Sequence, residues 1–269
     1  MKEIAIEDIK TISFDILCDV HDFCVEHGIC YSLSYGTLLG AIRHKGFIPW
    51  DDDIDIMMPR PDYERFCETY NSEKGFRCLC AQKDRYWSAY ARVCDMERTI
   101  VESPAPMGEK PNGVWIDLFP VDGAEDDELL WYRHAKDAKE KLNELLLHRF
   151  RVKLLRGNLI SKCKYLVYYL MGKCRVEEIT MQYVSLCKRI PYGKTFYVCD
   201  YTGCHHDLPK RHSISLFDEF VMKEFEGKQF CVIGGYDQFL RNCYGDYMEL
   251  PPVEKRVYLH SAHKYFWKK

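Results

Sequence analysis

The N-terminal segment places apolar residues at intervals of three and four. The residues that follow this spacing are Ile9, Ile12, Ile16, Val20 and Phe23. Such spacing puts side chains on one face of a helix. Gly28 comes next, and glycine is favoured just beyond a helix C-terminus. The pattern therefore predicts a long amphipathic helix over residues 4–27, whose apolar face packs on a core.

After this helix the apolar runs become shorter, and turn residues separate them. Gly36-Thr37 and Lys45-Gly46 are typical of turns, and a Pro-Arg-Pro sequence at 59–61 is typical of the end of a strand. The expected elements are strands over 30–34 and 53–58 and helices over 38–43 and 62–70.

The rest of the chain predicts further strands and then a long helical stretch. Two or three strands are expected within 75–101 and another over 114–118, followed by a turn at 120–123, a helical stretch over 126–169, a loop-rich part over 191–235 and a short helix over 237–243.

Composition narrows the class of protein. Of the 269 residues, 47% are hydrophobic, which is enough for a substantial core. The net charge of −3 argues against a surface devoted to nucleic acid, so no nucleic-acid partner is expected. The 14 cysteines follow no secreted disulfide framework, and the N-terminus lacks the layout of a signal peptide. We therefore expect reduced thiols and a cytoplasmic location.

A group of acidic residues set in apolar sequence carries the candidate chemistry. Its members are Asp51, Asp52, Asp53 and Asp55. Because side chains alternate between the two faces of a strand, Asp53 and Asp55 are expected on one face, with isoleucines pointing into the core. Carboxylates held in this way suit Mg²⁺ or Mn²⁺, since Mg²⁺ prefers one or two carboxylates together with substrate phosphates. The motif thus predicts a metal-dependent phosphoryl-transfer site.

Two other interpretations of the acidic group fit less well. An EF-hand loop would need glycine where Ile56 stands and a bidentate glutamate where Asp62 stands. A solvated acidic turn is the usual role of a charge run, but the alternating isoleucines favour a core strand, where an unpaired carboxylate is costly. A nucleotidyltransferase-type site fits better, because a Gly-Thr turn and a helix precede the Asp-x-Asp strand. The turn lets a phosphate approach the backbone at the helix N-terminus.

Four sequence blocks make the chain resemble a known family. They are SYGTLLGAIR at 34–43, IPWDDDIDI at 48–56, WIDLFPVDG at 115–123 and YGDYMELPP at 244–252, the last followed by Lys255-Arg256 and His260. Together they are similar to the LicD family of bacterial phosphorylcholine transferases, to which fukutin-type phosphotransferases are distantly related. The resemblance extends over about residues 25 to 260.

The resemblance implies an α/β (α+β) fold of the nucleotidyltransferase-like kind, in which helices flank a mixed sheet. It also implies three parts of the chain with different roles. Residues 1–125 would form the catalytic core, 126–190 a basic helical segment, and 191–269 a cap that completes the active site. Asp53 and Asp55 would be metal ligands, and Asp117 a third carboxylate, as either a ligand or a base.

Further residues are expected at the substrates. The expected donor-phosphate contacts are Gly36, Thr37, Arg43, Lys45 and Arg92, although a solvated surface charge is an equally good explanation of the three basic residues. The other expected contacts are Tyr35, Trp50, Asp51, Arg256 and His260. If the transferred alcohol is choline, an aromatic cage could include Trp50, Tyr86, Trp87 and Tyr90, although core or rim packing is the favoured explanation of these residues because aromatics are abundant in the chain.

The resemblance implies the metal-dependent transfer of a phospho-alcohol from a CDP-activated donor to a sugar hydroxyl, with release of CMP. Phosphocholine from CDP-choline is the leading choice, and ethanolamine, ribitol and glycerol stay open. The acceptor would be a bacterial cell-surface polysaccharide or glycolipid, such as lipopolysaccharide, teichoic acid or capsule. Two alternatives stay open: a nucleotidyltransferase that joins a nucleoside monophosphate to a small molecule and releases pyrophosphate, and a non-catalytic module that binds glycans or membranes.

The stretch 145–176 is basic and contains no acidic residue. Leucines and other apolar residues alternate with its eight lysines and arginines. It is too charged to span a bilayer, but it could lie on an anionic membrane surface at the inner face of the plasma membrane. A solvated basic face on a helical hairpin is an equal alternative.

Overall fold

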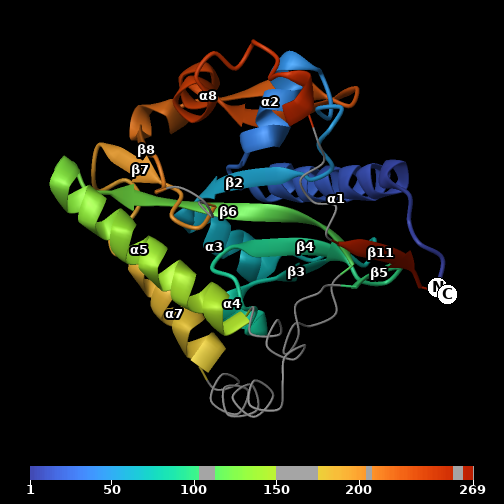
Figure 1. Ribbon diagram of the computed structural model, residues 1–269, viewed down its shortest axis with the longest axis horizontal. Helices are drawn as coiled ribbons and strands as arrows, with labels where there is room; N and C mark the ends of the chain where they lie inside the picture. The colour runs from blue at the N-terminus through green and yellow to red at the C-terminus, as the bar shows by residue number, and fades with distance from the viewer. Residues whose placement is uncertain (103–112, 150–174, 204–207, 257–262, 269) are drawn as a thin grey trace.

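A mixed sheet forms the centre of the molecule. The computed structural model describes residues 1–102, 113–149, 175–203, 208–256 and 263–268. The strands of the central sheet run in the order β1 (Ser32–Leu33), β2 (Asp55–Pro59), β6 (Val114–Ala124), β4 (Ala91–Asp95) and β3 (Arg77–Leu79). Strands β2 and β6 are parallel, and the other pairs in this row are antiparallel. Helices flank the sheet (Figure 1), so the predicted fold class is confirmed.

Helix α1 (Ile6–His27) covers one face of the sheet together with α3 (Arg60–Thr69). Ile12, Ile16 and Val20 are buried, as their spacing predicts. Phe23 of α1 meets Phe66 of α3 edge to face, with ring centroids 5.7 Å apart. The helix ends at Gly28, whose φ of 59° lies in the left-handed region that glycine adopts without strain. The periodic pattern thus identified both this element and its end.

Several elements extend the sheet or cover its ends. Strand β7 (Tyr197–Cys199) pairs with the last residues of β6 and with β8 (Arg211–Ser213). Helices α5 (Glu128–Arg149) and α7 (Arg175–Cys187) lie side by side beyond it (Figure 1). The remaining strands are β5 (Thr99–Glu102), which pairs with β11 (Lys264–Trp267), and the hairpin of β9 (Phe220–Phe225) and β10 (Lys228–Ile233).

Short helices complete the chain. Helix α2 (Tyr35–Arg43) packs against α8 (Tyr236–Tyr244) at the edge of the sheet that β1 and β2 form (Figure 1). The others are α4 (Ala81–Asp84) and two 3₁₀ turns, Ile214–Phe217 and Val253–Lys255. No helix in the described part of the chain is both long and apolar enough to cross a bilayer. Of the basic stretch 145–176, residues 150–174 lie outside the described residues.

Among the predicted boundaries that differ from the structure, three concern the site. The strand expected over 53–58 begins at Asp55, so Asp53 lies in the loop that precedes it. The helix expected from residue 38 begins at Tyr35, so the predicted Gly-Thr turn is its first turn.

The third difference concerns residues 120–123, where a turn was expected. Strand β6 instead continues through them to Ala124. Asp117 donates its N–H to Ile54 O on the β2 side, so by alternation Pro120 faces the β4 side. Pairing with β4 has already ended at Leu118. Proline therefore removes no hydrogen bond of the ladder at this position.

Candidate active site

A pocket of about 580 Å³ opens where α2, the acidic loop and the segment after α8 meet. Its lining residues are Tyr35, Gly36, Leu39, Arg43, Ile48, Trp50, Asp51, Asp53, Asp55, Tyr244, Asp246, Tyr247, Glu249, Leu250, Pro251 and Pro252. Three of the four sequence blocks that carry the resemblance contribute to this wall, namely 34–43, 48–56 and 244–252. The third of these lies about 190 residues beyond the other two. The fold thus brings these blocks into one site.

The first turn of α2 forms one side of the pocket. A Cβ on Gly36 would lie 2.5 Å from Oδ2 of Asp51, so a larger residue there would displace that carboxylate. Thr37 is buried, and its Oγ1 accepts the N–H of Asp55 at 2.8 Å. Thr37 therefore ties α2 to the start of β2. Gly36 lies in the pocket wall, as predicted for a substrate contact, whereas the Thr37 hydroxyl is engaged with the backbone.

Negative charge concentrates at the floor of the pocket. Asp51, Asp53 and Asp55 all line it. The pKa of Asp55 is raised well above its ordinary value, first by burial and then by the charges of four other carboxylates: Asp53, Asp117, Asp51 and Asp200. Within the described residues, no ion pair or hydrogen bond reaches the Asp55 carboxylate. A positive group at this position would relieve both the burial cost and the repulsion.

Asp117 lies next to Asp55 but is already neutralised. The two residues are direct partners in the β2–β6 register, and Arg92 is the partner of Asp117 on β4. Arg92 Nε donates to Asp117 Oδ1 at 2.7 Å, and the guanidinium lies 4.1 Å from the Trp115 ring centroid. Neither Asp117 nor Arg92 lines the pocket. The structure therefore pairs the expected third carboxylate with one of the expected phosphate contacts.

The other predicted basic residues occupy different places. Arg43 lines the pocket, and its Nη1 donates to the carbonyls of Tyr247 at 2.6 Å and Glu249 at 3.2 Å. Burial lowers the pKa of Arg43, and the nearby charge of Arg256 lowers it further. Lys45 is exposed and does not line the pocket. Its carbonyl instead accepts the N–H of Glu226, which joins this turn to the β9–β10 hairpin.

Trp50 and Arg256 form a pair at the rim. The Arg256 guanidinium lies 5.3 Å from the Trp50 ring centroid, and its Nε donates to Pro251 O at 2.8 Å. His260 lies outside the described residues. Of the aromatics proposed for a choline cage, Trp50 lines the pocket. Tyr86, Trp87 and Tyr90 are buried and do not line it, since they pack in the core around Arg92.

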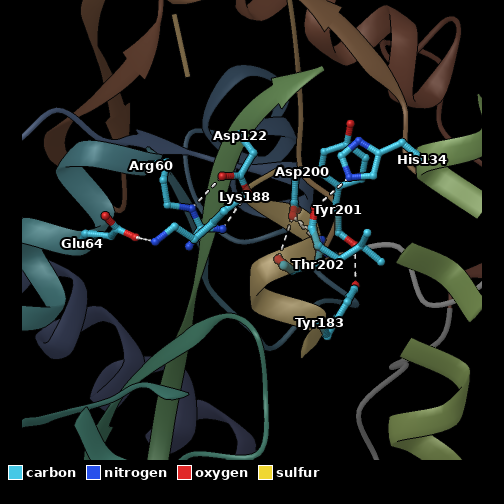
Figure 2. A network of polar contacts seen from close by, with 11 residues as sticks. Arg60, Glu64, Asp122, His134, Tyr183, Lys188, Asp200, Tyr201 and Thr202 are labelled. Carbon is cyan, nitrogen blue, oxygen red and sulfur yellow. Dashed lines mark hydrogen bonds and ion pairs between the residues drawn. The ribbon is translucent and has the colours of Figure 1, made fainter. Parts of the chain in front are cut away.

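Sequence reasoning missed several residues of the site. Tyr244, Asp246 and Glu249 line the pocket, although the sequence offered them only as a family block. Asp200 was missed entirely, because it lies in a part of the chain that predicts loops. Its carboxylate is buried, accepts the Tyr35 hydroxyl at 2.6 Å and lies close to Thr202 (Figure 2). The only signal for it is an acidic residue that directly follows an apolar strand.

The chemistry of the carboxylates fits a hard divalent cation. Across the described residues, no three histidine, cysteine or acidic side chains converge as a preformed metal site. Mg²⁺ commonly needs only one or two carboxylates, because water and substrate phosphates supply its other ligands. Asp53 and Asp55 meet that requirement, and a cation there would offset both the burial and the neighbouring negative charges that raise the pKa of Asp55.

Comparison with known proteins agrees with this arrangement. Residues 28–151 match the model of a domain described as "LicD/FKTN/FKRP, nucleotidyltransferase domain". The chain is 32% identical over 278 aligned positions to the lipopolysaccharide cholinephosphotransferase LicD of Haemophilus influenzae, covering 98% of this chain and 99% of that protein. A 67-residue stretch is 39% identical to an uncharacterised protein of Rickettsia typhi, covering 24% of this chain and 22% of that one. The chain therefore belongs to the LicD family and is a phosphotransferase.

Proposed function

We propose that this enzyme transfers phosphocholine from CDP-choline to a sugar hydroxyl of a lipopolysaccharide-type glycan and releases CMP. The Haemophilus influenzae relative, a lipopolysaccharide cholinephosphotransferase that aligns over almost the whole chain, supports the transferred group and the acceptor class. The observation that carries the proposal is the Asp55 carboxylate, which is surrounded by four others without a cation partner in the described structure.

The residues of the pocket suit this reaction. Asp53 and Asp55 would hold Mg²⁺ or Mn²⁺. The bound cation would neutralise charge on the diphosphate oxygens. The acceptor oxygen forms a bond to the phosphorus that carries choline, and the bond from that phosphorus to the CMP oxygen breaks. The proton of the acceptor hydroxyl passes to a carboxylate of the pocket. Alignment of donor and acceptor is the main task of the protein, because phosphoryl transfer depends on in-line positioning.

The composition of the pocket wall favours a cationic alcohol over a neutral one. Four aromatic residues, Tyr35, Trp50, Tyr244 and Tyr247, line the pocket. Asp246 and Glu249 add negative charge at the same wall. Aromatic faces and carboxylates attract a quaternary ammonium group, whereas ribitol and glycerol would gain little from either. Choline is therefore the alcohol that this wall matches best.

A panel of donors tests the proposal. CMP release is measured with CDP-choline, CDP-ethanolamine, CDP-ribitol and CDP-glycerol, with and without Mg²⁺ or Mn²⁺, and with a glycan extract as acceptor. We expect metal-dependent CMP release that is fastest with CDP-choline. The name of the matching domain keeps a nucleotidyltransferase as the competing function. Pyrophosphate release from nucleoside triphosphates, with no CMP from any donor, would establish that function instead.

The basic stretch 145–176 supplies the second part of the proposal, which is contact with an anionic membrane surface. This contact would bring the enzyme to an acceptor that is still attached to lipid at the inner face of the plasma membrane. Co-sedimentation with vesicles that contain phosphatidylglycerol should show binding at low salt that is lost at high salt. The absence of binding at low salt would remove the membrane from the proposal.

A further inference from the structure

Helix α2 begins with an unusual backbone conformation at Tyr35. Its φ is +42°, in the left-handed region that residues other than glycine seldom adopt. The side chain nevertheless has a defined place. Its ring lies 5.5 Å from that of Phe119 and 6.1 Å from that of Phe239, between centroids, and it lines the pocket. Such a conformation persists only where surrounding contacts fix it.

Asp200 supplies one of these contacts, from a distant part of the sequence. It follows strand β7, and its Oδ2 accepts the Tyr35 hydroxyl at 2.6 Å. Its Oδ1 accepts the Thr202 N–H at 2.7 Å, the Thr202 hydroxyl at 2.7 Å and the Gly203 N–H at 3.1 Å. The carboxylate is therefore held rigidly by its own loop while its other oxygen faces Tyr35.

The loop packs closely around this contact. A Cβ on Gly203 would lie 2.5 Å from Oδ2 of Asp200 and 3.1 Å from the Tyr35 hydroxyl. The backbone of the loop therefore lies directly against the hydrogen bond. In Figure 2 Asp200 and Thr202 lie near the buried ion pair of Arg60 and Asp122, which joins the start of α3 to the last residues of β6, and the charge of Asp200 acts on Asp122.

We propose that Asp200 is a positioning residue of the active site, which acts through Tyr35 to fix the pocket face at the first turn of α2. Asp200 itself does not line the pocket, so it reaches the substrates through the Tyr35 ring. The inference rests on the proposed function, because it assigns the Tyr35 face to the binding of the CDP-alcohol donor. The hydrogen bond sets the orientation of that ring before the donor binds.

Three variants and a matched control test the inference. Tyr35→Phe removes the hydroxyl but keeps the ring, Asp200→Ala removes the acceptor, and the double variant removes both. Tyr183→Phe is the control, since the Tyr183 hydroxyl donates to Tyr201 O at 2.5 Å in the same loop and the residue is absent from the pocket wall. Kinetics of CMP release from CDP-choline and thermal stability are measured for all four.

We expect kcat/KM for CDP-choline to fall on the order of 10–100-fold in Tyr35→Phe and in Asp200→Ala, since small misplacements cost this much. The kcat/KM of the double variant should equal that of the less active single variant, because the two residues act as one unit. Tyr183→Phe should lose thermal stability while its kcat/KM stays within about twofold, as expected of a purely structural hydrogen bond. Unchanged kinetics in Tyr35→Phe, or additive losses in the double variant, would overturn the inference.

A second readout separates this inference from the proposed function. Amide hydrogen exchange over residues 35–43 is compared between the wild type and the same variants. Faster exchange at the start of α2 in Asp200→Ala, and no change there in Tyr183→Phe, supports the positioning role. If the wild type releases no CMP, the proposed function fails, and exchange alone decides the inference. Unchanged exchange in Asp200→Ala then overturns it.

Discussion

The two ends of the β2–β6 strand pair treat their carboxylates in opposite ways. At one end Asp55 and Asp117 are register partners, and Asp55 lies among like charges. At the other end, just past Pro59 and Val121, Arg60 makes a bidentate pair with Asp122 at 2.7 and 2.6 Å. Both members of that pair are buried, at 4% and 1% exposure. The same two strands thus carry two acids that are paired with an arginine, Asp117 and Asp122, and one, Asp55, that lacks a counter-charge in the described structure.

The difference distinguishes a structural carboxylate from one suited to bind a ligand. Burial raises the pKa of Asp122, while the charge and hydrogen bonds of Arg60 act to lower it. For Asp55 the causes all act in the same direction, since burial and the charges of Asp53, Asp117, Asp51 and Asp200 each raise its pKa. A fold tolerates such repulsion when a cation relieves it during function.

The largest effect is expected from Asp55→Asn. Loss of the carboxylate should abolish CMP release, because the proposed cation loses a ligand, and Asp53→Asn should do the same. Stability without metal should stay equal or rise in Asp55→Asn, since like-charge repulsion is removed. Steady-state kinetics and urea unfolding measure the two quantities. Near wild-type turnover in both variants would remove Asp53 and Asp55 from the metal site.

The opposite result is expected at the other end of the strands. Asp122→Asn leaves the Arg60 charge buried and only partly compensated, so the free energy of unfolding should fall by about 3–5 kcal/mol. Arg60→Met combined with Asp122→Leu should recover most of the loss.

The exposed pair of Arg65 and Asp62, at 2.9 Å, is the control for this experiment. Arg65→Gln should change the unfolding free energy by less than about 1 kcal/mol. If Asp122→Asn had a similarly small effect, the pair would not be the structural anchor that its burial indicates.

A smaller effect is expected when metal is added. Mg²⁺ should stabilise the wild type by about 2.7 kcal/mol at a concentration 100 times its Kd, because it binds the folded state. Asp55→Asn should lose this stabilisation, whereas Asp122→Asn should keep it. Differential scanning fluorimetry with increasing Mg²⁺ or Mn²⁺ tests this. Equal shifts in wild type and Asp55→Asn would place the cation elsewhere.

The smallest effect concerns pH in the absence of metal. The folded-state pKa of Asp55 lies above the ordinary aspartate value of 3.8, so between these two pKa values the folded protein holds a proton that the unfolded chain has released. Stability therefore falls as pH rises from about 3.8 to the raised pKa, and this component is constant above that window. The urea midpoint of the wild type minus that of Asp55→Asn should fall over this pH range. A flat difference would contradict the raised pKa.

Local pattern predicted the elements whose interactions are close in the sequence. The apolar stripe of α1 and its end at Gly28 needed only helical spacing and the freedom of glycine. The glycine at 36 and the acids at 53 and 55 were found for the same reason, because turn, helix and strand follow each other directly. The pairing of a strand with distant strands cannot be predicted from local pattern. Asp53 was therefore predicted on a strand that in the structure begins only at Asp55.

The sequence alone determined the helix faces, the acidic block and the family, since each depends on residue types at short spacing. Only the tertiary structure decided which charges meet. It paired Arg92 with Asp117 and Arg60 with Asp122, left Asp55 among like charges, and brought Asp200 to Tyr35 across 165 positions of the chain. The reason is physical: the free energy of a charge depends on its distance from other charges and from water, and strand register and packing set those distances.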